Sequence, residues 1–336
     1  MSTTSSPLGA APPTGWGVQA RRSVGIRISE RAFVGLARAG ERVYRLTPRS
    51  RAVERIRSVA YADTGDPAHT LDVWRPKGGG DRLPVILYVH GGAFRSLSKN
   101  THWLMGAAFA RRGYLVFNVN YRLAPRHKFP TPLVDVCRAY EWVTDHAEAW
   151  GGDLSRLVLA GESAGANLVT ALSVAACYER PEPWAQRVLQ AERPPAAVLP
   201  ASGLYQITEP ERFWNRRPLP WWLVDQIAAC ADAYLPAEGL PAAAADLADP
   251  LRVFERAEAP AVPLPAFYIS AGTRDPVLDD SRRLYRALEG LGARAQLDLF
   301  AGEMHAFHAF VWRDAARRCW RNQFAFLDRV LAAPAG

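Results

Sequence analysis

A serine stands at the centre of the pentapeptide Gly161-Glu162-Ser163-Ala164-Gly165. The apolar run Leu157 to Ala160 before it is typical of a strand, and the run Ala164 to Cys177 after it is typical of a helix. In that context a G-x-S-x-G sequence makes a sharp turn that exposes the serine hydroxyl, because the glycines leave room for the backbone. An ordinary glycine-rich turn is the alternative, but the flanking segments favour a nucleophile at Ser163.

A serine hydroxyl becomes an effective nucleophile when a histidine accepts its proton and a carboxylate orients that histidine. Asp275 and His305 follow Ser163 in the chain order Ser, Asp, His. Asp275 comes just past the strand-like run Phe267 to Ser270, and His305 follows a second such run, Leu297 to Phe300. We therefore predict the triad Ser163, Asp275 and His305. The alternatives are Asp279 and Asp280 for the carboxylate and His308 for the base.

Attack on a carbonyl group creates an oxyanion, which backbone N–H groups can stabilise if they already point at it. The segment His90-Gly91-Gly92-Ala93 follows the strand-like run Val85 to Val89 and offers such donors with little side-chain bulk. The N–H after the nucleophile, that of Ala164, adds another donor. We predict an oxyanion hole formed by Gly91, Gly92, Ala93 and Ala164, against the alternative of a tight turn that needs glycine flexibility.

The elements around these residues alternate between strands and helices, which predicts an α/β fold with a mostly parallel sheet. The expected strands are Val85 to Val89, Tyr114 to Val119, Leu157 to Ala160, Ala196 to Leu199 and Phe267 to Ser270. The expected helices are His102 to Arg112, Leu133 to His146, Ala164 to Cys177 and Ser281 to Leu291. Two shorter runs, Val59 to Tyr61 and Leu71 to Trp74, flank a turn-rich segment and predict an antiparallel hairpin.

Two regions interrupt this alternation. Residues 1–17 have the composition of a disordered leader, and residues 28–46 form a loose helical pattern that Pro48 ends. Residues 203 to about 255 carry no strand signal and include several aromatic residues, so we expect an insertion between two core strands.

Composition and charge narrow the classes of function. Hydrophobic residues make up 49% and charged residues 22% of the 336 residues, which is ordinary globular usage. The net charge of +8 comes from residues 21–57, which hold eleven Arg and three Glu, whereas residues 58–336 balance thirty positive against thirty negative charges. We therefore expect no nucleic-acid partner for the body of the protein.

The spacing of the cysteines and the length of the apolar runs indicate the cellular compartment of the protein. The four cysteines are far apart and form no C-x-x-C pair, so we expect reduced, buried thiols. Arg21-Arg22 is similar to a twin-arginine export signal, but Arg27, Glu30 and Arg31 interrupt the stretch that should be apolar. The run of residues 163–178 is too short and polar to span a membrane. We expect a cytoplasmic protein without a membrane span.

Four motifs in order resemble the hormone-sensitive-lipase branch of the α/β-hydrolases, the bacterial family IV esterases. They are His90-Gly91-Gly92-Ala93, then Tyr121-Arg122-Leu123-Ala124-Pro125 with Phe129-Pro130 and Asp135, then residues 161–165, and then Asp275-Pro276 with His305-Ala306-Phe307. Together they cover about residues 55 to 325. Two positions depart from the family pattern, since Ala93 and Ala166 stand where the family usually has glycine. Neither change removes a catalytic group, although both could narrow the substrate range.

The resemblance implies an eight-stranded α/β-hydrolase core with a helical cap. Its expected organisation is residues 1–54 as leader and N-terminal cap segment, 55–202 as the first part of the core, 203–255 as the cap insertion and 256–336 as the second part of the core. The resemblance also implies hydrolysis of short- to medium-chain carboxylic esters through an acyl-enzyme, with no metal and no cofactor. A homodimer is expected by resemblance only.

Three questions stay open at this point. Trp214, Trp221 and Trp222 either line the substrate pocket or pack the cap onto the core. The same triad could hydrolyse an amide such as an arylformamide. The family also contains receptors that bind small molecules without catalysis, but the complete set of Ser163, Asp275 and His305 argues against that interpretation.

Overall fold

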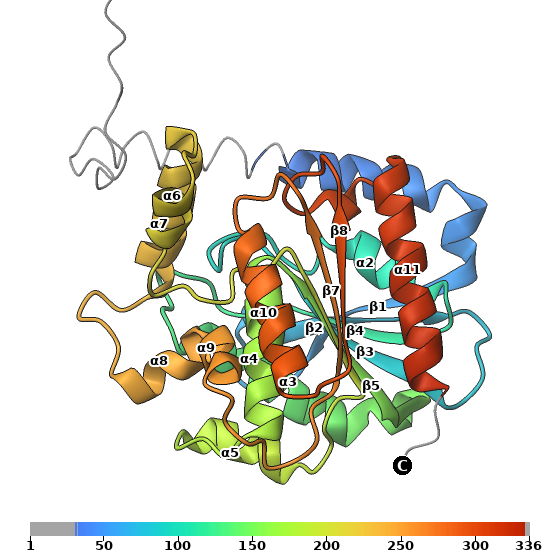
Figure 1. The fold of residues 1–336 in the computed structure, drawn as a ribbon. Coiled ribbons are helices and arrows are strands. Elements are labelled where there is room, and N and C mark those ends of the chain that lie inside the picture. The colour runs from blue at the N-terminus through green and yellow to red at the C-terminus, as the bar shows by residue number, and fades with distance from the viewer. Residues whose placement is uncertain (1–30, 32, 333–336) are drawn as a thin grey trace, which may run out of the picture.

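The structure, a computed structural model, describes residue 31 and residues 33–332. The expected leader, residues 1–17, lies outside this range. A single eight-stranded sheet runs through the centre in the order β1-β2-β4-β3-β5-β6-β7-β8 (Figure 1). The strands are β1 (Val53–Ala60), β2 (Thr70–Pro76), β3 (Leu83–Val89), β4 (Leu115–Val119), β5 (Gly152–Glu162), β6 (Ala197–Ala201), β7 (Ala266–Gly272) and β8 (Ala295–Phe300).

The sheet is mostly parallel, as the sequence predicts. Strands β3 to β8 pair in parallel, whereas β1 and β2 form the expected antiparallel hairpin and β2 pairs antiparallel with β4. Each parallel connection needs a crossover on one face of the sheet, so helices cover both faces. The predicted α/β-hydrolase fold is confirmed.

Helices fill the gaps between the strands. The α-helices are α2 (Trp103–Ala110), α3 (Thr131–His146), α4 (Ala164–Cys177), α5 (Pro183–Gln190), α6 (Arg212–Arg216), α7 (Trp221–Tyr234), α8 (Ala242–Ala248), α9 (Pro250–Glu255), α10 (Leu278–Gly290) and α11 (Asp314–Leu331). Short 3₁₀ turns are η1 (Pro48–Ala52), η2 (Pro67–His69), η3 (Ala147–Trp150) and η4 (Phe307–Ala309). Residues 33–45 are also helical and end before Pro48, as expected.

Successive side chains of the central strands enter two separate cores. In β3, Val85, Leu87 and Val89 pack with α3, α4 and α10, whereas Ile86 and Tyr88 pack with α2 and α11 on the opposite face. Figure 1 shows α11 and the helical residues 33–45 on one side of the sheet and α3, α4 and α10 on the other. Because both faces are buried, these strands are continuous apolar runs in the sequence.

The chain between β6 and β7 forms helices α6 to α9 and no strand. Figure 1 shows α6 and α7 rising beyond the end of the sheet, while α8 and α9 lie beside α4. The helical segment 33–45 joins the core through Trp103, whose indole N–H donates to the main-chain oxygen of Ala37 at 2.9 Å. Both irregular regions of the sequence are therefore helical additions to a regular sheet.

A buried ion cluster holds the antiparallel edge of the sheet. Asp72 on β2 is fully buried and accepts hydrogen bonds from Lys99 Nζ at 2.7 Å and from Arg55 Nε at 2.7 Å. Burial raises the pKa of Asp72, but the hydrogen bond from Lys99 and the charge of Arg55 outweigh that effect and lower it below its ordinary value. Arg55 also reaches Glu41 at 2.7 Å, so the cluster ties residues 33–45 to the sheet.

We predict that Asp72→Asn lowers the free energy of unfolding by about 3–5 kcal/mol, because it leaves buried cations without their partner. The change is measured by urea unfolding at neutral pH. Glu54→Gln is the control, since Glu54 pairs with Arg75 on the same hairpin but at the exposed surface, where such a pair contributes little. Equal stability of the two variants would contradict this interpretation of the cluster.

Candidate active site

Ser163 lies in a strained turn between β5 and α4. Its backbone has φ +53° and ψ −117°, a conformation that residues with a side chain rarely adopt. The turn is tight because α4 approaches the sheet closely at Gly165, where a Cβ atom would overlap the main-chain oxygen of Val89 on β3. A Cβ atom at Gly161 would likewise overlap the backbone of Gly165. The two glycines are therefore what lets Ser163 stand at the end of the strand.

Ser163, His305 and Asp275 come together at the carboxyl ends of the parallel strands. His305 Nε2 lies 2.9 Å from Ser163 Oγ, and His305 Nδ1 lies 3.0 Å from each carboxylate oxygen of Asp275. These distances are within hydrogen-bond range, and they connect side chains that are 112 and 142 residues from Ser163 in the chain. The arrangement can pass the serine proton to the imidazole.

Burial and two further hydrogen bonds fix the position of Asp275 next to His305. Asp275 is fully buried, and its Oδ1 accepts a hydrogen bond from the backbone N–H of Val277 at 3.0 Å. Arg217, from the segment before α7, donates to the main-chain oxygen of Asp275 at 2.7 Å. Burial lowers the pKa of His305, but the charge of Asp275 and its hydrogen bond outweigh this effect and raise the pKa above its ordinary value.

The alternative candidates from the sequence have other partners. Asp280 is buried and binds Arg212 at 2.5 Å and the backbone N–H of Tyr205 at 2.9 Å, so it joins α10 to the chain after β6. Asp279 forms an ion pair with Arg216. Neither carboxylate contacts His305, and His308 points to a different carboxylate described below.

The segment after β3 makes a tight turn next to Ser163. Gly92 has φ +115° and Ala93 has φ +52°, and a Cβ atom at Gly92 would overlap the main-chain oxygen of Ser96. Gly92 and Ala93 line a cavity of about 310 Å³ together with Ser163 and His305. The other residues that line this cavity are Phe33, Arg95, Ser96, Leu97, Glu162, Gln226 and Ala306. Gly91 does not line this cavity, and a Cβ atom at Gly91 would lie 3.0 Å from the main-chain oxygen of Glu162.

Helix α7 packs against the segment after β3 and contacts its residues 93–95. The rings of Phe94 and Tyr234 stack with centroids 3.7 Å apart, and Cys230 Sγ donates to the main-chain oxygen of Ala93 at 3.6 Å. Arg95 reaches the main-chain oxygen of Ala229 at 3.4 Å. The insertion therefore helps to fix the backbone that was predicted to bind an oxyanion.

The motif that begins at Tyr121 contacts the segment after β3 at His90. The Tyr121 hydroxyl donates to the main-chain oxygen of His90 at 3.0 Å, and its ring stacks on the His90 imidazole. Arg122 forms a bidentate pair with the buried carboxylate of Asp135 at 2.7 and 2.8 Å, and His69 approaches the same carboxylate at 3.1 Å. The motif of Tyr121, Arg122 and Asp135 therefore fixes the position of His90, at the start of the segment next to Ser163.

Comparison with known proteins agrees with this geometry. The sequence model of a family described as alpha/beta hydrolase fold matches residues 86–309, which is more than half of the chain. The chain belongs to the α/β-hydrolase fold family.

One curated relative of this α/β-hydrolase is Esterase LipQ of Mycobacterium tuberculosis, 28% identical over 251 residues. The match covers 73% of this chain and 55% of LipQ, so the chain spans about half the length of that relative. A solved structure described as Bacterial Heroin Esterase has a TM-score of 0.75 at 22% identity, and 92% of each chain is covered. A hormone-sensitive lipase from a metagenome library has a TM-score of 0.65 at 20% identity, covering 94% of this chain and 98% of that one. The predicted resemblance to the hormone-sensitive-lipase branch is confirmed.

Sequence reasoning missed the environment of Glu162 in this hydrolase. The sequence motifs do not indicate the partners of Glu162, whose side chain is buried between two histidines. His102 Nε2 lies 2.8 Å from Oε1, and His308 Nε2 lies 2.8 Å from Oε2. Burial raises the pKa of Glu162, yet the two histidines outweigh it and lower the pKa well below its ordinary value. Because His308 is three residues from His305, this contact ties the His305 segment to the serine turn.

The three tryptophans of the insertion do not line the cavity at Ser163. Trp221 and Trp222 lie at the exposed start of α7, and Trp214 packs against the core. One turn further along, α7 presents Gln226 to the cavity instead. Trp221 is five residues before Gln226 and therefore lies on another side of the helix. Trp222 is four residues before Gln226 and lies on the same side, but one turn closer to the exposed start of α7.

The described part of the chain contains neither a metal-binding cluster nor a helix able to cross a membrane. No group of three or more His, Cys, Asp or Glu side chains there is placed to hold a metal ion. None of the helices found there has the length and apolar character that crossing a membrane requires.

We predict that Gly165→Ala lowers the free energy of unfolding by about 1–3 kcal/mol or more, because the added methyl group meets backbone atoms that cannot rotate away. Thermal unfolding measures the change. Gly290→Ala is the matched control, since a Cβ atom there meets nothing within 4 Å at the end of α10. A Gly165→Ala protein as stable as this control would show that α4 can move away from β3.

Proposed function

We propose that this protein is a serine carboxylesterase that hydrolyses short- to medium-chain carboxylic esters through an acyl-enzyme. The observation that carries the proposal is the chain of hydrogen bonds from Ser163 to His305 to Asp275 at the end of the sheet. The fold and the similarity to LipQ support it further.

In the proposed first step, Ser163 Oγ attacks the ester carbonyl carbon while His305 Nε2 takes the serine proton. The resulting imidazolium returns that proton to the leaving alcohol, and the acyl group stays on Ser163. In the second step, neutral His305 takes a proton from water, and the hydroxide oxygen attacks the acyl carbon. Breaking the bond to Ser163 Oγ then releases the carboxylic acid, and the serine regains its proton.

Asp275 acts through His305. Its carboxylate accepts the Nδ1–H, which leaves Nε2 of the neutral ring free to receive the serine proton. The same negative charge stabilises the imidazolium in each step. The raised pKa of His305 is consistent with that role.

Backbone N–H groups of Gly92, Ala93 and Ala164 are proposed to hold the oxyanion. Gly92 and Ala93 border the cavity, and Ala164 is the first residue of α4, where backbone N–H groups have no partner within the helix. Gly91 is proposed to contribute by allowing a close approach to the serine turn, because a Cβ atom there would lie only 3.0 Å from the main-chain oxygen of Glu162.

The volume of the cavity at Ser163 favours small ester substrates. A volume of about 310 Å³ lies at the low end of the usual range for ligand pockets. Phe33 from the N-terminal helical segment and Gln226 from α7 both line it, so we propose that the N-terminal cap segment within residues 1–54 and the insertion 203–255 together act as the cap.

We predict that the protein hydrolyses p-nitrophenyl acetate and butyrate faster than p-nitrophenyl palmitate, because the cavity at Ser163 is small. Ser163→Ala should lower kcat by at least about 10³-fold, since it removes the nucleophile. Release of p-nitrophenolate measures both effects. Ser155→Ala is the control, because Ser155 is an exposed serine near the other end of β5 and its hydroxyl contacts Asp153 rather than the cavity.

Two outcomes would contradict the proposal. A Ser163→Ala protein that keeps the wild-type rate would show that Ser163 is not the nucleophile. Folded wild type that cleaves none of these esters would favour amide substrates or a binding role for the same fold.

We predict an acidic limb in the pH profile of kcat/KM with a midpoint above 6.5, because His305 must be neutral to take the serine proton and its pKa is raised above that value. Activity should therefore fall as the pH decreases through this midpoint. Asp275→Asn removes the charge that raises the pKa, so the midpoint should move to lower pH. The same change should lower kcat by roughly 10⁴-fold, as the equivalent change does in serine proteases.

Glu162→Gln should also move the midpoint to lower pH, but by less than Asp275→Asn, because the charge of Glu162 contributes less to the pKa of His305. Glu209→Gln, an exposed carboxylate paired with Arg252, is the control and should leave the midpoint unchanged. A midpoint that does not respond to either buried carboxylate would rule out His305 as the titrating base.

A further inference from the structure

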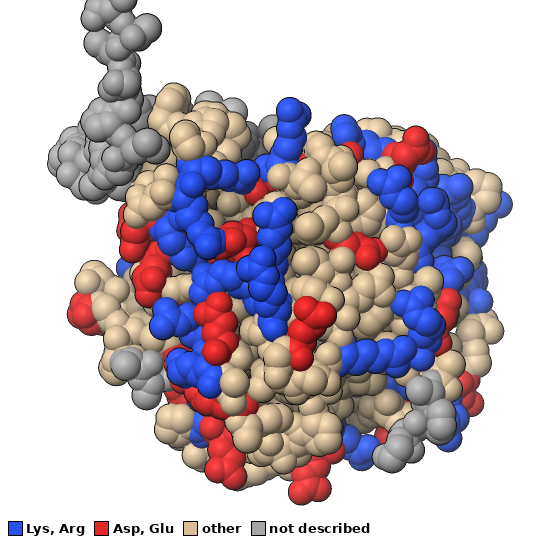
Figure 2. All heavy atoms as spheres, in the orientation of Figure 1, with Lys and Arg blue, Asp and Glu red and all other residues tan. Residues whose placement is uncertain are grey.

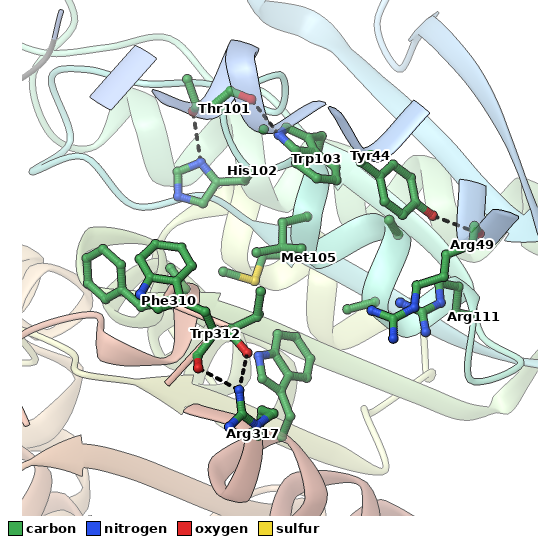
Figure 3. Close-up of a pocket in the computed structure, with 18 of the residues that line it drawn as sticks. Tyr44, Arg49, Thr101, His102, Trp103, Met105, Arg111, Phe310, Trp312 and Arg317 are labelled. Carbon is green, nitrogen blue, oxygen red and sulfur yellow. Dashed lines mark hydrogen bonds between the residues drawn. The ribbon is translucent and has the colours of Figure 1, made fainter. Parts of the chain in front are cut away.

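A second and larger cavity, of about 700 Å³, lies on the face of the sheet that carries α2 and α11. The helical residues 33–45 form one wall, α2 forms the floor, and the chain from η4 into α11 forms the opposite wall. Figure 3 shows Tyr44, Arg49 and Arg111 on one side of it and Phe310, Trp312 and Arg317 on the other, with Met105 between them. Neither Ser163 nor His305 lines this cavity, so it is a neighbour of the cavity at Ser163, with which it shares Phe33 and Glu162.

The walls of this cavity are mainly apolar, and several of them are uncovered within the described part of the chain. Leu36, Val43 and Trp312 are 58%, 64% and 64% exposed although all three face the cavity. Large apolar side chains gathered at a concave surface mark a place where a ligand or partner removes them from water. Trp103, Met105 and Phe324 continue the apolar surface inward.

One end of the cavity carries two guanidinium groups that pair with no carboxylate in the described part of the chain. Arg49 and Arg111 have no acidic partner among residues 33–332, whereas Arg112 pairs with Asp328 and Arg317 pairs with Asp314. Burial raises the pKa of Tyr44, and the charges of Arg111 and Arg49 oppose that rise, so both guanidinium groups act on the same phenol. Figure 2 shows Lys and Arg side chains gathered along the side of the molecule where α11 and residues 33–45 lie.

We propose that this cavity binds a single anionic amphiphile, an aliphatic carboxylate, with its chain along Trp103, Met105 and Trp312 and its carboxylate between Arg49 and Arg111. Charge complementarity selects the head group, because two guanidinium groups at one end of an apolar cavity attract an anion that carries an apolar chain. The volume suits one such molecule, since it lies within the usual range for small-molecule pockets.

The site is also placed to influence the ester site. His102 and Glu162 form the inner end of the large cavity, and Phe33 and Glu162 line both cavities. A ligand there contacts the residues that hold the serine turn without touching Ser163. Binding itself does not depend on esterase activity, so the two proposals can fail separately.

The test measures binding of sodium dodecanoate, below its critical micelle concentration, to Ser163→Ala protein by isothermal titration calorimetry. We expect one molecule to bind per chain, and dodecyltrimethylammonium, with the same chain and the opposite charge, to bind at least tenfold more weakly. Arg49→Gln combined with Arg111→Gln should weaken dodecanoate binding at least tenfold. The matched control combines Arg38→Gln with Arg42→Gln, which removes the same charge from exposed positions outside the cavity and should change the Kd by less than twofold.

A second variant tests the apolar part of the site. Ala108 faces the cavity from α2, so Ala108→Trp should fill it and abolish dodecanoate binding while the thermal unfolding temperature stays close to that of the parent protein. Dodecanoate binding that is unchanged in the folded Arg49/Arg111 double variant would overturn the proposal. So would absence of dodecanoate binding, including the case in which phosphatidylglycerol vesicles bind instead, because the cavity would then be part of a lipid-surface contact.

Discussion

The close approach of α4 to β3 is the constraint on which the rest of the site depends. Gly165 allows it, because any side chain there would meet the main-chain oxygen of Val89. The approach forces Ser163 into a conformation with φ +53° and lifts its hydroxyl above the ends of the strands. His305, the segment Gly92 to Ala93 and the first N–H groups of α4 are then all arranged around one point.

Buried carboxylates tie this point to distant parts of the chain. Asp275 orients His305, Glu162 joins the serine turn to His102 and His308, and Asp135 fixes the segment that supports His90. Each carboxylate accepts hydrogen bonds or pairs with a cation, which is what allows a charge to be buried. Removing one of them affects both folding and the geometry around Ser163, so activity alone cannot separate the two effects. The midpoint of the pH profile of kcat/KM separates these two effects, because it reports the pKa of His305.

The parts of the site that sequence predicted depend on local signals. Ser163 sits in a short motif between recognisable elements, and Asp275 and His305 each follow a strand. The partners of Glu162 could not be predicted in this way, because His102 and His308 are 60 and 146 residues away. Helix α11 was also not predicted, although its buried residues Ala315, Cys319 and Phe326 recur at helical spacing. The side of α7 that faces the cavity depends on where that helix begins and on how it packs, which composition does not determine.

Covalent labelling tests the central claim most directly. A p-nitrophenyl alkylphosphonate reacts when a serine oxygen attacks phosphorus and p-nitrophenolate leaves, so the protein gains the mass of one phosphonyl group. We expect one adduct per chain, located by peptide mass spectrometry on Ser163, with much slower labelling of Asp275→Asn because its His305 no longer activates the serine. An adduct on another residue, or no adduct on folded wild type, would contradict the account.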